Sequence, residues 1–370
     1  MINELDNDAD AQRAEIAAAF GQDLDPLAEY KTAFERMDAD PFDLFLADVM
    51  STKDRSERTL DGYVRTFRQW RAFMAERDRH PACPSEGHVK AFIRRELEER
   101  DNRPATIKNK LHRLNRVYRY WQDDPAFPHP QDYNPIKLAK SKMDFSEKAK
   151  KEPPRIPIED LRNILAEVTH IRDRAIIVTQ LKLGLRATEV CNLKLSEVCI
   201  ENVEARRHYP EMCTYPALED HQNAVYIPHH REGNKSKRPR MLPLDDEMRR
   251  VLLRYLLIRP ATDAPWVFLS KNTYGQLHRE SVSDVWADAF HPEYEETERH
   301  AAVSSHFGRH RFTTYWQVEK EASRELVKYM RGDTAGSADF RERGAIDEYI
   351  HTYYEDIETL YRENIYKLGV

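Results

Sequence analysis

The spacing of apolar side chains in the first half of the chain predicts a bundle of helices. Residues three and four apart share one face of an α-helix. In the clearest stretch, bulky apolar residues recur at those intervals: Tyr63, Phe67, Trp70 and Phe73. Stretches of the same period at 89–97 and 107–121 predict a second and a third helix, and Pro104 marks the start of the third.

The second half of the chain alternates helical patterns with one hairpin. Residues 174–183 form an apolar helical stretch that runs into Gly184. Two short β-prone segments, 225–228 and 240–243, flank a polar turn and predict a β-hairpin. Further helices are expected at 245–258, 279–290 and 310–321, and the last 25 residues are helical in pattern. The fold class is therefore mainly α with a small β-hairpin or sheet, an α+β chain.

Composition shifts divide the chain into four expected parts. Residues 1–38 form an acidic, alanine-rich arm, and 39–135 form a helical domain. A lysine-rich stretch at 136–156, which ends in a cluster of prolines, predicts a basic linker. Residues 157–370 form the second domain, and 370 residues are enough for two or three cores.

The net charge of −6 is concentrated in the arm. Residues 1–50 carry 13 Asp and Glu against three Lys and Arg, so the remainder is slightly basic. Such a balance permits local basic surfaces, which polyanion binding requires. No apolar run is long enough to span a membrane, and the N-terminus does not resemble a secretory signal.

The cysteines predict reduced thiols in an intracellular, cytoplasmic protein. No two of them form a CxxC pair, and their spacing is not that of a metal site. The four are Cys83, Cys191, Cys199 and Cys213.

One face of the third helix is almost purely basic. A solvated charged face usually mixes acids with bases, so contact with a phosphate backbone competes with simple solvation as its explanation. The residues assigned to this face are Lys108, Lys110, His112, Arg113, Arg116 and Arg119.

Two arginine motifs of the second domain suggest phosphate chemistry. Arg186 follows Gly184-Leu185, and Glu189 lies three residues later as a salt-bridge partner or a support for the guanidinium. His306, Arg309 and His310 share one face of a helix, so all three project together. An arginine fork matches two phosphate oxygens. A zinc site at His306 and His310 is the alternative, although a third ligand is missing from the pattern.

The polar turn and the tail complete the candidate chemistry. The turn contains three basic residues, Lys235, Lys237 and Arg238. A lysine there could donate a proton beside a phosphate, or the turn could only contact backbone phosphates. Tyrosine forms covalent bonds to phosphorus. The tail offers five such residues: Tyr349, Tyr353, Tyr354, Tyr361 and Tyr366.

The order Arg…Lys…His-x-x-Arg…Tyr over residues 40–370 resembles the tyrosine recombinase, or phage-type integrase, family, and the acidic arm and tail resemble its archaeal members. The resemblance implies a helical core-binding domain that grips one side of the duplex and a C-terminal catalytic domain. It assigns phosphate binding to Arg186 and Arg309 and protonation of the leaving oxygen to Lys235, with Lys237 as runner-up. His306 would hydrogen bond to a phosphate oxygen or handle the proton of the nucleophile.

The resemblance also assigns the nucleophile and the partners. The run ending in Tyr349-Ile350-His351 matches the family's Tyr-x-His, with Tyr353 and Tyr354 as alternatives. The implied protein cleaves and rejoins double-stranded DNA recombination sites through a 3′-phosphotyrosyl bond, without metal, nucleotide or other cofactor. It acts as a homotetramer that exchanges its C-terminal tail, and phages or proviruses carry such enzymes.

One position departs from the family pattern. Asp333 stands where the family commonly has His or Trp. A carboxylate repels phosphate, so its expected task is to orient an arginine or the lysine. Asp333 also supports an alternative, a DNA-binding relative that has lost catalysis. A relaxing enzyme of the type IB topoisomerase class is the third possibility.

Overall fold

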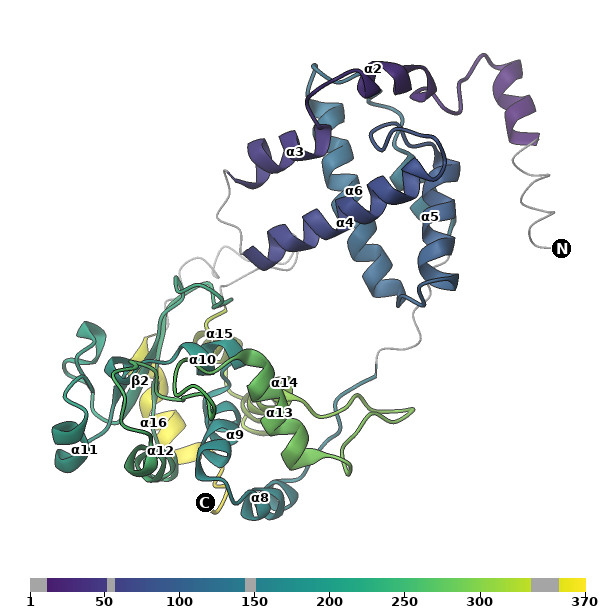
Figure 1. Ribbon diagram of the computed structural model, residues 1–370. Coiled ribbons are helices and arrows are strands. Elements are labelled where there is room, and N and C mark those ends of the chain that lie inside the picture. Colours follow the sequence, from purple (N-terminus) through teal and green to yellow (C-terminus); the bar gives the residue numbers. More distant parts are fainter. Residues whose placement is uncertain (1–11, 52–56, 144–150, 334–352) are drawn as a thin grey trace. The chain divides into compact units, whose positions relative to one another are not determined.

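The computed structural model describes residues 12–51, 57–143, 151–333 and 353–370. The chain divides into two compact units, Met1–Lys150 and Lys151–Val370. Each unit has its own hydrophobic core. Figure 1 shows the helical N-terminal unit and the C-terminal unit, which contains the strands. The mainly α fold with a small antiparallel sheet is confirmed.

Helices build the N-terminal unit. They include α2 (Lys31–Glu35), α3 (Pro41–Phe45), α4 (Glu57–Ala75), α5 (Glu86–Glu98), α6 (Pro104–Asp123) and α7 (Pro135–Lys142), with the short turns η1 (Ala28–Tyr30) and η2 (Leu46–Met50). Pro104 begins α6, as the sequence predicts. Aromatic side chains from α3, α4 and α6 fill the core: Phe42 packs edge-on against Phe67 and Trp121 at centroid distances of 4.7 and 4.8 Å.

Packing in the N-terminal unit extends into both neighbouring segments. Leu27 and Phe34, from the predicted acidic arm, are buried in the core of this unit. The helix α7, within the predicted linker, buries Ile136 and Ala139 in the same core. Apolar burial therefore fixes these flanking residues, although their charge and proline content alone favour an arm and a linker.

Lys110 does not belong to the basic face of α6. It lies three residues after Ile107 and four before Leu114, and both of these are buried. This register turns Lys110 towards the core, where its ammonium pairs with the fully buried Glu96. The assignment of Lys110 to the exposed basic face was therefore wrong. Lys110 is a single charged residue on the apolar, core-facing side of α6.

The C-terminal unit combines helices with a three-stranded sheet. Its elements are α8 (Ile158–Glu167), α9 (Ile171–Leu183), α10 (Ala187–Asn192), η3 (Leu195–Glu197), β1 (Val198–Cys199), α11 (Val203–His208), η4 (Pro216–Leu218), β2 (Ala224–Ile227), β3 (Arg240–Pro243), α12 (Asp246–Ile258), α13 (Arg279–Phe290), α14 (Ser305–Thr314), η5 (Tyr315–Glu319), α15 (Arg324–Arg331) and α16 (Tyr354–Asn364). The strands are antiparallel in the order β1-β2-β3, with Val225 opposite Leu242. The hairpin is confirmed, whereas β1 was not predicted.

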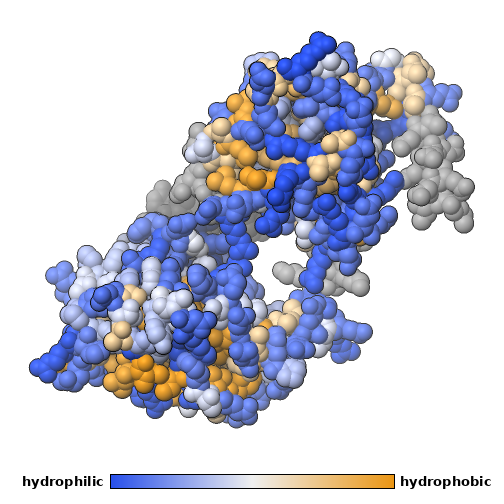
Figure 2. All heavy atoms as spheres, in the orientation of Figure 1, coloured by the Kyte–Doolittle hydropathy of each residue, from blue (hydrophilic) through white to orange (hydrophobic). Residues whose placement is uncertain are grey.

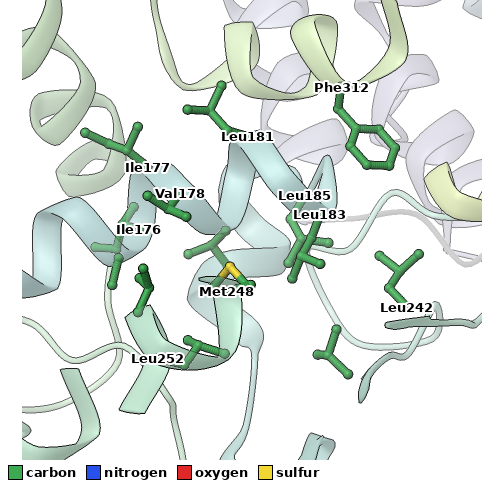
Figure 3. Close-up of a cluster of buried hydrophobic side chains, with 14 of the residues drawn as sticks. Ile176, Ile177, Val178, Leu181, Leu183, Leu185, Leu242, Met248, Leu252 and Phe312 are labelled. Carbon is green, nitrogen blue, oxygen red and sulfur yellow. The ribbon is translucent and has the colours of Figure 1, made fainter. Parts of the chain in front are cut away.

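The helix α9 forms the centre of this core. Eleven of its 13 residues are buried, which explains why its sequence shows no polar face. Figure 3 shows Ile176 and Val178 of α9 near Met248 and Leu252 of α12, while Phe312 of α14 and Leu242 of β3 lie near Leu183 and Leu185.

A glycine lets α14 pack closely on α9. A Cβ added to Gly308 would lie 2.9 Å from the Cβ of Gln180 and 3.0 Å from its backbone carbonyl carbon. Any larger residue would push the helices apart. The helix predicted at 310–321 begins earlier than expected, at Ser305, and is followed by a π-type turn at Tyr315–Glu319.

The cysteine expectation was wrong for one pair. The structure joins Cys199, at the end of β1, to Cys213 as a disulfide. Cys83 and Cys191 are free and buried. In the view of Figure 2, hydrophilic side chains predominate on the surfaces of both units. Within the described part of the chain, no helix is long and apolar enough to cross a membrane.

A buried ion-pair network joins α9, α12 and the C-terminus. The ammonium of Lys182 is fully buried and lies 2.6 Å from Asp245 and 2.8 Å from Glu247. Glu247 also accepts hydrogen bonds from the backbone N–H groups of Leu368, Gly369 and Val370. Burial raises the pKa of both carboxyls, but Lys182, with smaller contributions from Lys367 at Asp245 and from backbone N–H groups of the tail at Glu247, lowers the net pKa of each.

Removing this lysine should destabilise the protein in a pH-dependent way. In the Lys182→Met variant, two buried carboxylates lose their shared cation, which costs about 3–5 kcal/mol. In the native protein their stabilising contribution is present above the unfolded pKa of about 4 and is lost as the pH falls below it. The difference in Tm between the two proteins should therefore be fully present from about pH 7 down to about pH 4 and shrink as the pH falls below about 4.

Thermal unfolding of the full chain at several pH values measures this difference. Arg249→Met is the matched control, because Arg249 pairs with Asp246 at the surface of α12, and such pairs contribute little. A Tm difference for Lys182→Met that stays constant with pH would show that Asp245 and Glu247 are not coupled to Lys182 as described.

Candidate active site

Arg186 is placed by the end of α9. Gly184 ends this helix in the left-handed region, with φ 61°, and a Cβ there would lie 2.6 Å from the ring of Phe312. Only glycine combines this backbone angle with so little space. The chain then turns at Arg186, which is the N-cap residue of α10. The Arg186 side chain is 22% exposed, so its guanidinium remains accessible from solvent.

Glu189 supports the arginine from inside the protein. Its buried carboxylate accepts a hydrogen bond of 2.8 Å from the backbone N–H of Arg186 and one of 2.9 Å from Arg240. The hydroxyl of Ser236 also donates to it. Burial raises the pKa of Glu189, but the charge and hydrogen bonds of Arg240, with smaller contributions from Arg309 and Ser236, lower it to about 2. Glu189 is therefore an anion that orients the cluster.

Arg309 is a buried cation on α14 and lies beside Arg186. It is 3% exposed, and its guanidinium donates to the carbonyl oxygens of Gly184 and Arg331, each at 2.9 Å. Burial and the positive charge of Arg186 lower its pKa to about 9. Because Arg309 is buried beside another cation, an anion that approaches it stabilises its positive charge strongly.

Asp333 joins the two arginine motifs. One carboxylate oxygen lies 3.3 Å from Arg186 and 3.1 Å from Arg309, and the other lies 2.9 Å from the Nε of Arg331. The preceding Gly332 ends α15 with φ 68°, and a Cβ there would lie 2.5 Å from Arg240. The expectation that Asp333 orients an arginine agrees with these contacts.

The β2–β3 turn reaches the same cluster through Ser236. This buried residue hydrogen bonds to Glu189, Arg186 (3.2 Å) and Arg240 (2.9 Å). Its neighbours Lys235 and Lys237 are exposed. The half-buried Arg238 lies over the ring of Tyr329, 5.3 Å from its centroid. Ser236 therefore anchors the turn while the lysines on either side face solvent.

The two histidines of α14 are exposed at its N-terminal half. The rings of His306 and His310 meet edge to face with centroids 4.6 Å apart. Partial desolvation and the positive charge of His310, Arg309 and Arg186 lower the pKa of His306. No group of three or more His, Cys, Asp or Glu residues suited to a metal ion occurs in the described ranges, so the zinc alternative finds no third ligand there.

The candidate nucleophiles differ in their surroundings. Tyr349 lies outside the described residues. Tyr353 is 61% exposed at the start of α16. Tyr354 is buried against His221, and its hydroxyl donates to Glu358 at 3.1 Å. These contacts do not involve the arginine cluster, and burial raises the pKa of Tyr354, which disfavours its phenolate.

Two tail tyrosines belong to the core. The hydroxyls of Tyr361 and Tyr366 donate to the backbone carbonyls of Lys182 and Leu181 in α9, at 2.7 and 2.5 Å. Both side chains are buried. The tail helix is shorter than its pattern predicts, because α16 ends at Asn364.

Sequence reasoning missed three residues of the cluster: Ser236, Arg240 and Arg331. Arg240 could have been predicted from the sequence, because a charged residue in a short buried strand requires a buried anion as its partner. Ser236 and Arg331 carried none, since a serine in a polar turn and an arginine at a helix end are common at surfaces.

The basic residues of α6 are held by α4 in the N-terminal unit. Arg113 donates to the hydroxyl of Thr66 and Arg116 to that of Tyr63, each at 3.1 Å. Both arginines, like Lys108, are partly exposed.

Two family models match the chain. The model of the phage integrase family matches residues 155–334. The model of the phage integrase N-terminal SAM-like domain matches residues 42–124. No curated protein sequence matches the chain.

Several solved structures share the fold. The Tn1549 transposon integrase in complex with transposon right end DNA is 16% identical with a TM-score of 0.60, covering 86% of this chain and 97% of that chain. A lambda integrase dimer bound to a COC′ core site is 15% identical, with a TM-score of 0.57 and coverage of 82% and 96%. A lambda integrase tetramer bound to a Holliday junction is 14% identical, with a TM-score of 0.59 and coverage of 91% and 88%.

The matched family models take in more than two thirds of the 370 residues, and both units have their counterparts among them. The chain therefore belongs to the phage integrase family and is a tyrosine-type site-specific DNA recombinase.

Proposed function

We propose that this protein cleaves and rejoins double-stranded DNA at specific sites through a 3′-phosphotyrosyl intermediate. The observation that carries the proposal is the convergence of Arg186 and Arg309, from separate helices, on one anionic oxygen at 3.3 and 3.1 Å. Two guanidiniums aimed at one point can bind a phosphate and stabilise the charge that develops on it during displacement.

The charge of the cluster supports phosphate binding. Among the described residues, four arginines meet two carboxylates, Glu189 and Asp333, so positive charge is in excess there. The four are Arg186, Arg240, Arg309 and Arg331. Partly buried cations without matching anions raise the affinity for an incoming anion, because the surrounding dielectric is low.

In the proposed reaction, the Tyr349 oxygen attacks the phosphorus. The tyrosine–phosphorus bond forms as the bond to the 5′-oxygen breaks, and Lys235 gives that oxygen its proton. His306, whose lowered pKa favours the neutral imidazole, takes the proton of the tyrosine hydroxyl. Rejoining runs these steps in reverse, so the phosphodiester energy is conserved without metal or nucleotide.

The proposal includes an assembly on DNA. The basic residues Lys108, Arg113 and Arg116 of α6, with Lys237 and Arg238 of the β2–β3 turn, contact the phosphate backbone. We propose a homotetramer on paired sites. In the single chain, α16 covers its own unit and buries Ile357 and Tyr361. In the tetramer, we propose, a neighbour's tail makes these contacts.

A DNA-binding relative that has lost catalysis is the second candidate. One observation favours it: the carboxylate of Asp333 already occupies the point where the two arginines converge. Covalent capture of DNA separates the two functions, because only the enzyme forms an adduct that survives denaturation.

The nucleophile assignment predicts the effect of three single substitutions. Tyr349→Phe removes one hydroxyl, so site binding should persist while covalent capture disappears. Tyr353→Phe and Tyr354→Phe should retain capture. The measurement uses a duplex of the target site, nicked beside the scissile phosphate so that the cleaved fragment is lost, with adducts resolved on denaturing gels. Loss of the adduct in Tyr353→Phe alone would move the nucleophile to that residue.

The phosphate contacts predict a large cleavage defect for a charge-conserving change. Arg309→Lys keeps the charge but loses the planar fork, so the single-turnover rate of adduct formation should fall by about 10²–10³-fold. Arg207→Lys is the matched control, because Arg207 is 80% exposed and contacts only Glu204, at 3.9 Å, among the ion pairs described. An Arg309→Lys protein that cleaves at the native rate would remove this residue from the proposed clamp.

The α6 surface predicts a change in salt dependence. If Arg116 contacts a backbone phosphate, Arg116→Gln should lower the slope of log affinity against log salt by about 1 for specific and non-specific duplexes alike. Arg36→Gln, an equal charge change at an exposed site of the same unit, serves as control. Equal slopes for both variants and the native protein would place the DNA elsewhere.

A further inference from the structure

The anion held by the arginine pair in the free protein is one of the chain's own side chains. A single oxygen of Asp333 receives Arg186 at 3.3 Å and Arg309 at 3.1 Å, while its second oxygen meets Arg331 at 2.9 Å. Three guanidiniums from three different segments thus surround one carboxylate. Arginine forks bind carboxylate and phosphate with the same geometry.

The two carboxylates of the cluster have different surroundings. Glu189 is 1% exposed and is bonded to a backbone N–H, a hydroxyl and a buried arginine. Asp333 is 31% exposed and its contacts are with guanidiniums. Arg309 is 3% exposed beside it. Glu189 is therefore a fixed part of the cluster, whereas Asp333 lies between buried Arg309 and solvent.

A hydrogen bond holds the backbone of Asp333, whereas its carboxylate is 31% exposed. Gly332 caps α15 in the left-handed region, and the Asp333 N–H donates to the carbonyl of Lys328 at 3.0 Å. Displacement of the carboxylate from the arginines therefore needs a change of the Asp333 χ1 rotamer and no movement of the backbone. Two anions cannot share these donors without strong repulsion, so an arriving phosphate and the Asp333 carboxylate exclude each other.

We propose that Asp333 is a built-in competitor for the scissile phosphate. In the free protein its carboxylate holds Arg186 and Arg309 together and occupies their anion position, and DNA must displace it before cleavage. This inference rests on the proposed phosphate binding by the arginine pair. Its consequence is that free phosphate binds the DNA-free protein poorly, whereas a phosphate on a bound duplex has an effective concentration high enough to displace the carboxylate.

Inorganic phosphate tests the competition directly on the full chain. Asp333→Asn removes the competing charge and leaves Arg309 buried without its anion, so its Tm should be lower than native in chloride. Phosphate should then restore the Tm, because a ligand that binds only the folded state stabilises it. The phosphate concentration for a half-maximal shift should be at least about tenfold lower than for the native protein.

Two further variants serve as a control and as an alternative test. In Glu319→Gln, the buried Arg311 also loses its carboxylate partner, 2.7 Å away, but no arginine pair converges there. Phosphate should therefore not rescue this variant more than chloride of equal ionic strength does. Asp333→His, which replaces the acceptor by a hydrogen-bond donor, should bind phosphate more tightly than the native protein and provides the test if Asp333→Asn does not fold.

The outcomes separate this inference from the proposed function. If the native protein captures nicked DNA but neither Asp333 variant gains phosphate affinity, Asp333 only positions the arginines and the competition is refuted. If no variant responds to phosphate and the native protein captures no DNA, the arginine pair is not a phosphate site and both proposals fall.

Discussion

The hydrogen bond from Arg309 to the carbonyl of Gly184 is the contact on which the site depends. It joins the end of α9 to the middle of α14, so the two arginine motifs, more than 120 residues apart, become one structure. The contact requires α14 to approach α9 closely, which Gly308 permits beside Gln180. It also requires the left-handed turn at Gly184, which exposes that carbonyl and directs Arg186 outwards.

A second layer holds these arginines by charge. Buried Arg240 pairs with Glu189, Glu189 holds the backbone of Arg186, and Ser236 ties the β2–β3 turn to both. A buried arginine that loses its anion destabilises the folded protein, so the loss of any one partner in this layer should be costly. The C-terminal tail also stabilises this region, because the hydroxyls of Tyr361 and Tyr366 donate hydrogen bonds to backbone carbonyls in the last turn of α9. The rigidity of the site thus comes from the core of the C-terminal unit.

The sequence predicted the elements with strong periodicity and the residues that form local motifs. α4, α5, α6 and the hairpin follow from patterns within one segment, as do the arginines beside Gly184 and after His306. The errors concern contacts between segments. Lys110 was assigned to the surface because its partner Glu96 lies in another helix. The burial of Leu27 and Ile136 depends likewise on the unit's core and not on local composition.

The arginine cluster was also predicted only in part, because some of its members come together only in the folded chain. Arg186, Glu189 and Arg309 could be predicted from sequence, but Ser236, Arg240 and Arg331 join them only through tertiary structure. Asp333 could be recognised as a departure, whereas its place between two arginines needed the fold. The nucleophile remains a prediction, because Tyr349 lies outside the described residues.

The proposed reaction depends most on covalent chemistry at one tyrosine. Mass spectrometry of the DNA-linked peptide, obtained from the native protein trapped on its nicked target duplex, tests it directly. The account predicts a phosphotyrosyl bond at Tyr349. A bond at buried Tyr354, a bond to another residue type, or no linked peptide from a specifically bound duplex would contradict it.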